Sequence, residues 1–460
     1  MTDNTRSFGA TSLTLTGVGT VIGAGIFVIT GQAAAALAGP AIALSFVIAC
    51  IVCVFSALCY AEMAAMIPDK GSGYSYAKAA FGPRIGWIIG WALFAEYLFA
   101  MSAIAIGWSA YMQGVIGGFG IHLPAAIASS PLAMTGQSFS ATGAVINLPA
   151  VLIIAAVAWS HLSGVKESAR FNLTTVWIKL SAVFLFIGFG LAHADPSLWT
   201  PFIPAVETHP DGSTAYGIPG MLQAAGMVFF AYLGFDALAT AAHETRDPQR
   251  NLPIAILGTL GISTLLYILV SMAMTGLADF RTLGSDAPIT TALAAVPDLA
   301  WLKTYVGVAV TIGLWAALWP CVFAVSRLLM VFSDDGFLPA SVAAHSPAGI
   351  PKAALLTAGG LGAAVAGVFP IALLGELIST GTLLAFATVC AAVIHLRRTQ
   401  PDRPRPFRVP LWPVVATLGI ASALFLLASM GWYAAARIAA WQAIGVGILL
   451  IVSQRRRAAA

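Results

Sequence analysis

The fold is decided at Val21-Ile22-Gly23-Ala24-Gly25-Ile26-Phe27, where glycines interrupt an apolar stretch, and again at Phe229-Phe230-Ala231-Tyr232-Leu233-Gly234-Phe235-Asp236. In a membrane every backbone polar group needs a partner. Unwound backbone at mid-membrane therefore persists only where protein, water or a ligand takes up the freed groups. The two stretches hold corresponding places in the two halves of the chain. We predict two structural repeats that meet at a binding site.

The composition sets the class of protein. Of the 460 residues, 59% are apolar and 9% are charged, and the mean hydropathy is +0.90, which indicates a multi-spanning membrane protein. About twelve runs reach the roughly twenty apolar residues that cross a bilayer. They begin near Leu13, Ile42, Ile85, Leu148, Phe171, Pro219, Leu252, Trp301, Ala353, Ile371, Pro410 and Ala434. The third and eighth runs are longer than a vertical crossing needs, so we expect them to tilt.

The basic residues gather on alternate loops. With Arg6 placed inside and the runs alternating, 18 of the 22 basic residues fall in inner loops or tails. Arg281, Lys303 and Arg437 fall outside, and Lys179 lies within a run. The positive-inside rule then predicts cytoplasmic termini in the cell membrane. The net charge of +4 is an orientation signal, and no nucleic-acid partner is indicated.

Sequence motifs exclude other classes of protein. No Gly-x-x-x-x-Gly-Lys-Ser/Thr loop is present to drive a primary pump with ATP. The seven histidines fall in loops or near the ends of runs, and none has a carboxylate or cysteine at metal-ligand spacing. We therefore expect no cofactor, no metal site and no enzyme active site. The first run lacks a small-residue cleavage site, so we expect it to be retained as a helix.

The two breaks offer opposite chemistry. A half-helix that starts near Gly25 presents free N–H donors and a positive dipole end, which suits a carboxylate. A half-helix that ends near Phe230 and Ala231 leaves carbonyl oxygens free to accept from a cationic group. For the first break alone, close helix packing is the alternative, because Gly19 and Gly23 form a small-xxx-small pair. Together the breaks indicate a site for an α-amino acid.

Several ordered motifs carry a resemblance to a known family. They are Gly17-Val-Gly-Thr-Val-Ile-Gly-Ala-Gly-Ile-Phe27, Tyr60-Ala-Glu-Met63, Gly71-Ser-Gly-Tyr-Ser-Tyr76, Gly90-Trp91 with Glu96-Tyr97, Phe229-Phe-Ala-Tyr-Leu-Gly-Phe-Asp236 and Glu244-Thr-Arg-Asp-Pro-Gln-Arg-Asn-Leu-Pro253. From about Ser12 to Arg408 the chain resembles the amino acid-polyamine-organocation superfamily, and within it the bacterial branch of the cationic amino acid transporter family.

The resemblance implies an all-α membrane protein of about twelve transmembrane helices with the leucine-transporter fold. In this fold two inverted repeats of five spans, here 12–195 and 218–397, have their first helices broken, and two peripheral helices follow over 410–453. The whole chain is then one membrane domain. The resemblance also implies where substrate binds. The carboxylate site falls on the amides around Gly23, Ala24 and Gly25, and the ammonium site falls on the carbonyls of Val21, Phe230, Ala231 and Leu233.

Lys179 is the most informative single side chain. A lysine near the centre of a membrane helix costs about 2.5–3.5 kcal/mol on insertion scales and needs a compensating role. It lies too deep for easy snorkelling, and its natural partners are freed carbonyls near Gly19 to Gly23. The resemblance implies that a fifth-span lysine takes the place of a sodium ion. We hypothesise that protonation of Lys179 couples protons to substrate; the alternative is a permanently charged brace for the broken first helix.

Four further side chains are candidates for the pocket. Phe230 is a candidate outer gate, or ordinary packing. Trp315 and Trp319 are four residues apart on one helix face, so two indoles could shorten the distal pocket; the alternative is that both face lipid or packing. Glu96 matches an acidic residue of the family, and its role is left open. A short pocket predicts small neutral amino acids such as alanine, serine or glycine.

The sequence as a whole predicts a plasma-membrane transporter that takes up small neutral amino acids by alternating access, coupled to protons. The alternatives on the same fold are amino acid exchange, sodium symport and a cationic substrate. A non-transporting amino acid sensor is the alternative of another class. The expected partners are the amino acid, protons, the lipid bilayer and possibly a small membrane accessory subunit.

Overall fold

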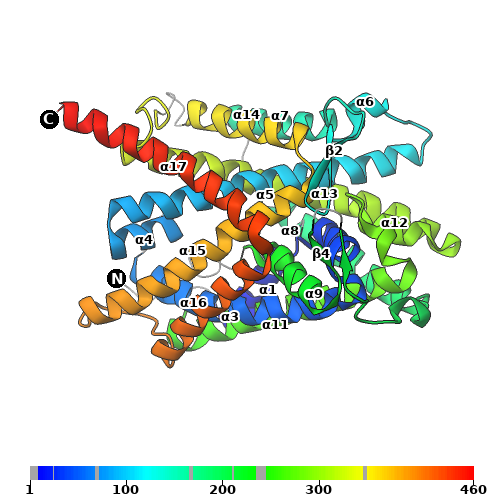
Figure 1. Ribbon diagram of the computed structural model, residues 1–460, viewed down its shortest axis with the longest axis horizontal. Coiled ribbons are helices and arrows are strands. Elements are labelled where there is room, and N and C mark those ends of the chain that lie inside the picture. Colours follow the sequence, from blue (N-terminus) through cyan, green and yellow to red (C-terminus); the bar gives the residue numbers. More distant parts are fainter. Residues whose placement is uncertain are drawn as a thin grey trace.

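The computed structural model describes residues 9–23, 25–67, 72–164, 169–209, 212–234, 245–344 and 350–459. Nearly all of this chain is helical (Figure 1). The helices of the first half are α1 (Ala10–Val21), η2 (Gly25–Ile29), α2 (Thr30–Ala33), η3 (Ala34–Ala38), η4 (Gly39–Ala41), α3 (Ile42–Met66), α4 (Gly73–Phe81), α5 (Pro83–Gly117), α6 (Ala125–Ala128), α7 (Leu148–Leu162), α8 (Ala169–Ala192) and η5 (Pro196–Trp199).

The second half continues the same architecture. Its helices are α9 (Gly217–Val228), η6 (Phe229–Tyr232), α11 (Pro248–Leu277), η8 (Phe280–Leu283), α12 (Pro288–Ala294), η9 (Pro297–Leu299), α13 (Ala300–Asp334), α14 (Lys352–Val368), α15 (Ile371–Thr399), α16 (Trp412–Ser429) and α17 (Gly431–Ala459). Each apolar run of the sequence corresponds to a helix that begins within four residues of the predicted start. Hydrophobicity alone therefore located the helices.

Eight helical stretches of the described residues are long and apolar enough to cross a membrane. Three shorter apolar helices, α7, α9 with η6, and α14, accompany them. The mostly helical architecture is confirmed. The count of twelve spans stays a prediction, because α1 and α9 contain only 12 residues each.

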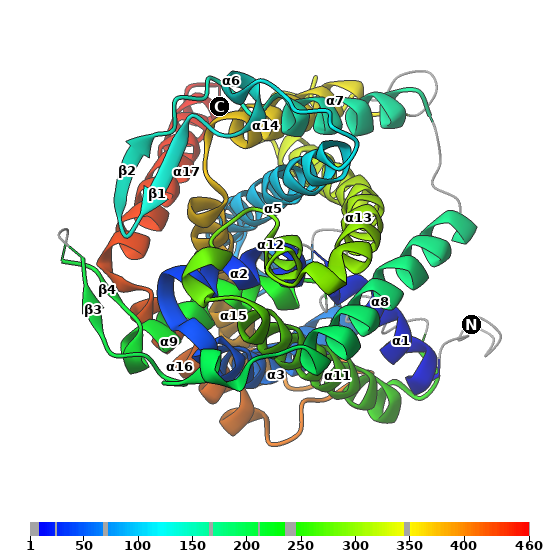
Figure 2. The ribbon, with the colours of Figure 1, turned by 90° about the vertical axis from the view of Figure 1, so that its right-hand side faces the viewer.

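Two long helices form the centre of the molecule. α5 and α13 each contain 35 residues, about 52 Å at 1.5 Å per residue against a hydrocarbon core of about 30 Å. They pack along each other, and α15 packs against α5. Figure 2 looks onto the right-hand end of Figure 1 and shows α2 beside α12 near the middle, between the pair of long helices and α15. The predicted extra length of these two runs is confirmed.

The connection between α5 and α7 and the connection between α8 and α9 each contain a short β-hairpin. β1 (Leu132–Thr135) pairs with β2 (Ser138–Ala141), and β3 (Glu207–Thr208) pairs with β4 (Thr214–Ala215). In the first hairpin the turn falls at Gly136, whose φ of 59° suits glycine. Both hairpins lie at the same end of the molecule as α12 (Figure 2).

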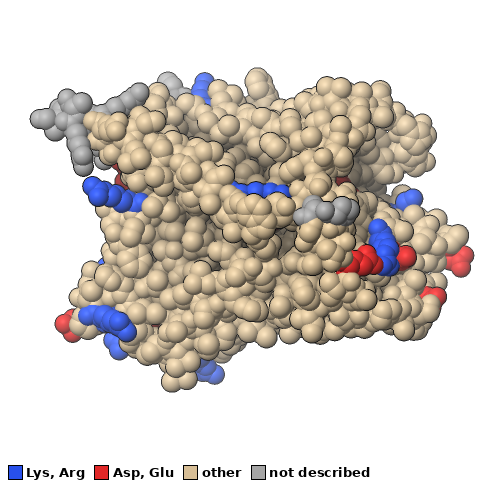
Figure 3. All heavy atoms as spheres, in the orientation of Figure 1, with Lys and Arg blue, Asp and Glu red and all other residues tan. Residues whose placement is uncertain are grey.

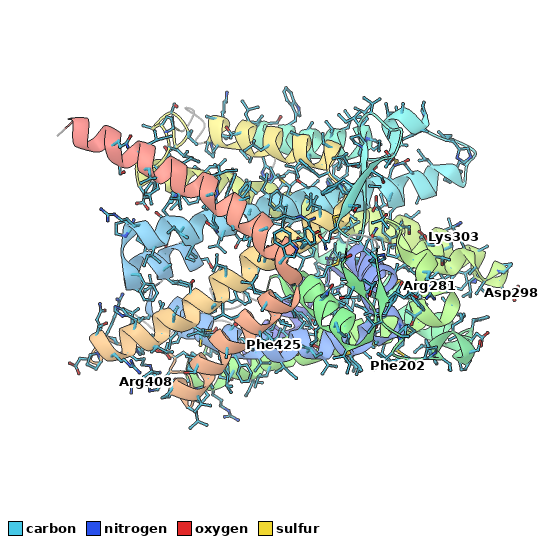
Figure 4. The ribbon with its side chains drawn as sticks, viewed as in Figure 1. Phe202, Arg281, Asp298, Lys303, Arg408 and Phe425 are labelled. Carbon is cyan, nitrogen blue, oxygen red and sulfur yellow. The ribbon has the colours of Figure 1, made fainter. Side chains whose placement is uncertain are left out.

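On the face that Figure 3 shows, charged side chains lie mainly towards the two ends of the molecule, and most of the surface between them is uncharged apart from a basic group near the middle. Arg408, which we predict to be cytoplasmic, lies at one end, and Arg281 and Lys303, which we predict to be external, lie at the other (Figure 4). This separation agrees with the predicted topology. The direction in which the protein sits in the membrane remains a prediction.

Candidate substrate and coupling site

The first break is present where the glycines predicted it. α1 ends at Val21, Ile22 turns out of the helix with ψ 95°, and helical backbone resumes at Gly25. Ala24 lies outside the described residues. The run that starts at Gly25 continues as a π-helical turn, so the N–H groups of its first turn have no acceptor in the preceding helix. These amides belong to the predicted carboxylate site.

The second break follows α9. The helix tightens into the 3₁₀ turn η6, Leu233 then takes an extended ψ of 137°, and Gly234 has a φ of 111°. A φ in this range is readily adopted only by glycine. The chain from Phe235 to Glu244, including Asp236, lies outside the described residues. The break therefore falls within the predicted stretch, directly after Phe230 and Ala231.

The two breaks are in direct contact. A Cβ atom placed on Gly25 would lie 2.3 Å from the Cα of Ala231, and one placed on Gly234 would lie 3.0 Å from the side chain of Thr20. Only glycine at position 25 permits this approach of the two backbones. The structure thus brings the predicted donor segment and the predicted acceptor segment together.

Tyr267 joins the breaks, and the sequence analysis missed it. Its hydroxyl, on α11, lies 2.9 Å from the carbonyl oxygen of Val21 and 2.7 Å from that of Ala231. Both carbonyls were predicted to accept from the substrate's ammonium group. A tyrosine within an apolar run was the available signal, because a buried phenol needs a hydrogen-bond partner. In this conformation the tyrosine takes the place predicted for the ammonium.

Other hydroxyl groups form hydrogen bonds with backbone groups near the two breaks. Ser379 on α15 accepts a hydrogen bond from the N–H of Phe230 and donates to the carbonyl of Met227, with distances of 3.3 and 3.0 Å. Thr30 donates to the carbonyl of Gly25 at 3.1 Å. Tyr111 on α5 donates to the carbonyl of Phe27 at 2.6 Å. Side chains from α5, α11 and α15 therefore hold the freed groups of both breaks.

Lys179 reaches the end of α1 from α8. Its Nζ atom lies 3.1 Å from the carbonyl oxygen of Ile22 and 3.5 Å from that of Gly19, and the residue is only 7% exposed. Its methylene chain packs against Gly313 of α13, where an added Cβ would lie 2.4 Å away. These contacts agree with the carbonyl partners that we predicted. They place a cation at the first break, and the coupling role stays a prediction.

The remaining candidates lie in different surroundings. Phe230 is buried in η6. Glu96 is 2% exposed at the contact between α5 and α15, close to Gly381. Trp315 is 39% exposed and packs edge-on against Trp108. Trp319 packs on His161 of α7, with ring centroids 4.2 Å apart.

Helix geometry separates the two indoles from the lysine. At 100° per residue, Trp315 is turned about 160° and Trp319 about 120° from Gly313, the residue that contacts Lys179. The described contacts do not bring either indole to the breaks. Their role in the distal pocket stays a prediction.

Contacts between distant segments are present at both ends of the molecule. At the hairpin end, Gln32 of α2 donates to the carbonyl of Gly284 at 3.0 Å. Gly31 lies so close to Pro288 that a Cβ would be 2.1 Å from it. At the other end, Lys78 of α4 pairs with Asp335 at 2.6 Å, and Tyr74 donates to the same carboxylate. Short loop helices thus cover each end.

Comparison with known proteins agrees with this geometry. The profile of the family described as "Amino acid permease" matches residues 8–453. The branched-chain amino acid permease BcaP of Bacillus subtilis (strain 168) is 37% identical over 452 residues, covering 98% of this chain and 93% of its own. The methylthioribose transporter of the same organism is 38% identical over 451 residues, covering 98% and 94%.

Plant proteins are similar as well. Cationic amino acid transporter 4, vacuolar, of Arabidopsis thaliana is 33% identical over 398 residues, which cover 86% of this chain and 64% of the relative. These relatives are named as transporters, which confirms the expectation of a transporter rather than an enzyme. The chain belongs to the amino acid permease family of the amino acid-polyamine-organocation superfamily and is a multi-pass membrane protein.

Proposed function

We propose that this protein takes up neutral amino acids across the cell membrane by proton-coupled alternating access. The observation that carries the proposal is the contact of a buried lysine, Lys179, with the carbonyls of Ile22 and Gly19 beside the two breaks. The substrate site, which binds a zwitterion, and Lys179, which holds one proton, then share the backbone of the first break. Movement of that proton changes the hydrogen bonding of the first break and hence of the substrate site.

The proposed mechanism uses the leucine-transporter fold with repeats over 12–195 and 218–397 and peripheral helices over 410–453. The breaks after α1 and α9 support it, because each follows the first helix of its repeat. The pair of 35-residue helices, third in each repeat, supports the same division. Rocking of helices around the breaks opens either end in turn.

The proposed substrate site uses backbone groups for the amino acid headgroup. The amides of Gly23, Ala24 and Gly25 take the carboxylate, and the carbonyls of Val21, Phe230, Ala231 and Leu233 take the ammonium. The hydroxyl of Tyr267 leaves Val21 and Ala231 when ammonium arrives. Its oxygen lies within hydrogen-bond distance of both carbonyl oxygens, but it has one proton to donate, whereas an ammonium group has three. Each bond lost is replaced by a charge-assisted bond to the ligand.

The proposed substrates are small neutral amino acids, with alanine, serine and glycine first. Lys179 is a charged side chain whose hydrogen bonds reach the backbone of the first break, and a second cation on the substrate would be repelled by it. BcaP is named for branched-chain amino acids, so leucine is the next substrate to test.

A second candidate comes from the relative named as a methylthioribose transporter, which is 38% identical to this chain. A sugar thioether carries neither ammonium nor carboxylate. Its binding would use hydroxyl contacts, which residues such as Ser379 and Tyr267 can offer. Competition between the two ligand classes separates these functions.

The test is uptake of labelled alanine into sodium-free proteoliposomes, with and without an imposed acid-outside pH gradient. Leucine, arginine and methylthioribose are added as unlabelled competitors. We expect accumulation that depends on the gradient and is blocked by leucine but not by arginine. Equal uptake without the gradient would contradict proton coupling. Preferential block by methylthioribose would reassign the substrate, and binding without uptake would support the sensor.

A further inference from the structure

A cavity of 180 Å³, lined by polar and apolar groups in similar measure, lies at the hairpin end of the molecule. Gln32 of α2, Gly284 and Asp286 of the loop before α12, and Ser129, Ser130 and Thr142 beside the first hairpin line it, together with the start of α15. This volume is below the 300–1,000 Å³ of pockets for drug-sized ligands and suits a smaller molecule. The cavity borders α2, which continues the half-helix that starts at Gly25. It therefore lies on the outer side of the proposed substrate site.

Asp286 supplies the charge in this cavity. Its Oδ1 atom accepts one hydrogen bond from the amide of Gln32 at 3.2 Å. In the described part of the chain no lysine, arginine or histidine pairs with Asp286, and no other lining residue is ionisable. The carboxylate is half-buried. A partly desolvated anion without a cation is costly, so a site of this kind gains stability when a cation binds.

We propose that this cavity is an outer subsite in which Asp286 holds the ammonium group of an amino acid on its way to the breaks. The inference rests on the proposed function, because the ligand is the same amino acid. Gln32 positions the carboxylate, and its amide also bonds to the carbonyl of Gly284 at 3.0 Å. A ligand in the subsite lies directly over α2. When α2 moves away from the loop at Gly284, the route inward opens.

The alternative is that Asp286 only fastens α2 to the loop. This alternative does not explain why the residue carries a charge. Gln32 already has the Gly284 carbonyl as an acceptor, so fastening the loop requires no charge. Burial raises the pKa of Asp286 from its ordinary value to about 6, which reflects an anion that the protein itself does not neutralise. A neutral asparagine would hold the loop equally well. The charge is explained by a cationic ligand.

The test is equilibrium binding of labelled alanine to the purified full-length protein near neutral pH. We expect two alanines per chain for the parent protein and one for Asp286→Asn, which keeps the acceptor for Gln32 and removes the charge. Asp298→Asn is the matched control, because Asp298 is exposed at the same end of the molecule (Figure 4). It should still bind two. Ala133→Trp, which fills the cavity and leaves the carboxylate, should also bind one.

The outcomes separate this inference from the proposed function. One alanine bound by both the parent and Asp286→Asn overturns the subsite and leaves amino acid transport standing. Displacement of the second alanine by sodium chloride but not by choline chloride would assign Asp286 to a metal cation and overturn the inference. No binding of alanine by the parent overturns both proposals. Two sites in the parent and one in each cavity variant support the subsite.

Discussion

The Nζ atom of Lys179 lies 3.1 Å from the carbonyl oxygen of Ile22, where α1 ends. A cation at this point stabilises the carbonyls that the break leaves free. If the proton of Lys179 drives transport, Lys179→Met should lower gradient-driven accumulation of alanine by about tenfold or more, because methionine keeps the chain length and loses the charge. Exchange of alanine across the membrane without a gradient should persist.

The control is Lys303→Met, since Lys303 is exposed at the hairpin end (Figure 4). It should accumulate alanine as the parent does. If Lys179→Met accumulated alanine fully in response to the pH gradient, the lysine would be a brace and coupling would reside elsewhere.

Gly25 tests the contact of the two breaks. An added methyl group would lie 2.3 Å from the Cα of Ala231, so Gly25→Ala must push the breaks apart. We expect affinity for alanine to fall by about tenfold or more in equilibrium binding. Gly114→Ala, a position with open space around it, is the control and should bind normally. Normal binding by Gly25→Ala would mean that the breaks do not form the site.

The sequence predicts the helices and the two breaks better than it predicts the contacts of the site. The apolar runs predict the starts of twelve helices, because a helix buried in a membrane requires a continuous apolar stretch. The breaks are predictable because glycine marks them, and the reach of Lys179 follows from the cost of burying its charge. The hairpin at Leu132 to Ala141 has no clear sequence signal, since its strands are short, the first is largely half-buried and the second is exposed along its whole length.

The site partners are harder to predict, because they come from distant segments. Tyr267 is 246 residues from Val21, and Ser379 is 149 from Phe230. Nothing local marks either residue as a partner of a break. Local spacing is also not enough to place a side chain in the site. The four-residue spacing puts Trp315 and Trp319 on one face of α13. The packing of α13 against α8 through Gly313 turns that face away from Lys179.

Tyr267 gives a prediction about the empty transporter. Tyr267→Phe removes the hydroxyl near the carbonyls of Val21 and Ala231, and a buried group without its partner costs about 1–3 kcal/mol. The melting temperature of the empty protein should fall, and the stabilisation by saturating alanine should increase, because the ligand's ammonium restores the lost bonds. Tyr433→Phe, whose ring packs on Trp432, should change neither. Equal stabilisation by ligand in Tyr267→Phe and the parent would place the ammonium elsewhere.

The buried ion pair of Glu62 gives a prediction about stability. Glu62 of α3 is 1% exposed, accepts two hydrogen bonds from Arg397 of α15 at 2.7 and 2.6 Å, and lies 3.4 Å from Arg405. Removal of one partner of a buried pair costs about 3–5 kcal/mol, so Glu62→Gln should unfold at a markedly lower temperature. Glu207→Gln breaks a pair with Arg281 in which both side chains are about half-exposed and should have little effect. Similar melting temperatures for the two variants would contradict this account.

The outer subsite gives a prediction about pH. Burial raises the pKa of Asp286 to about 6, so the carboxylate is mostly ionised at about pH 7.5 and mostly neutral at about pH 5. The other polar side chains that line the described cavity, Gln32, Ser129, Ser130 and Thr142, do not titrate in this range. A neutral carboxyl attracts ammonium only weakly. Binding of the second alanine should therefore weaken as the pH falls through about 6, while the alanine at the breaks stays bound.

Calorimetric titration with alanine at several pH values checks this prediction. The second site should be seen above pH 6 in the parent and disappear below it, a loss that follows protonation of one carboxylate. Asp286→Asn should show one site at every pH, because its side chain has no proton to gain. Asp286→Glu should restore the second site together with its pH dependence. A second site that persists at about pH 5 in the parent would show that the ammonium is held by groups other than Asp286.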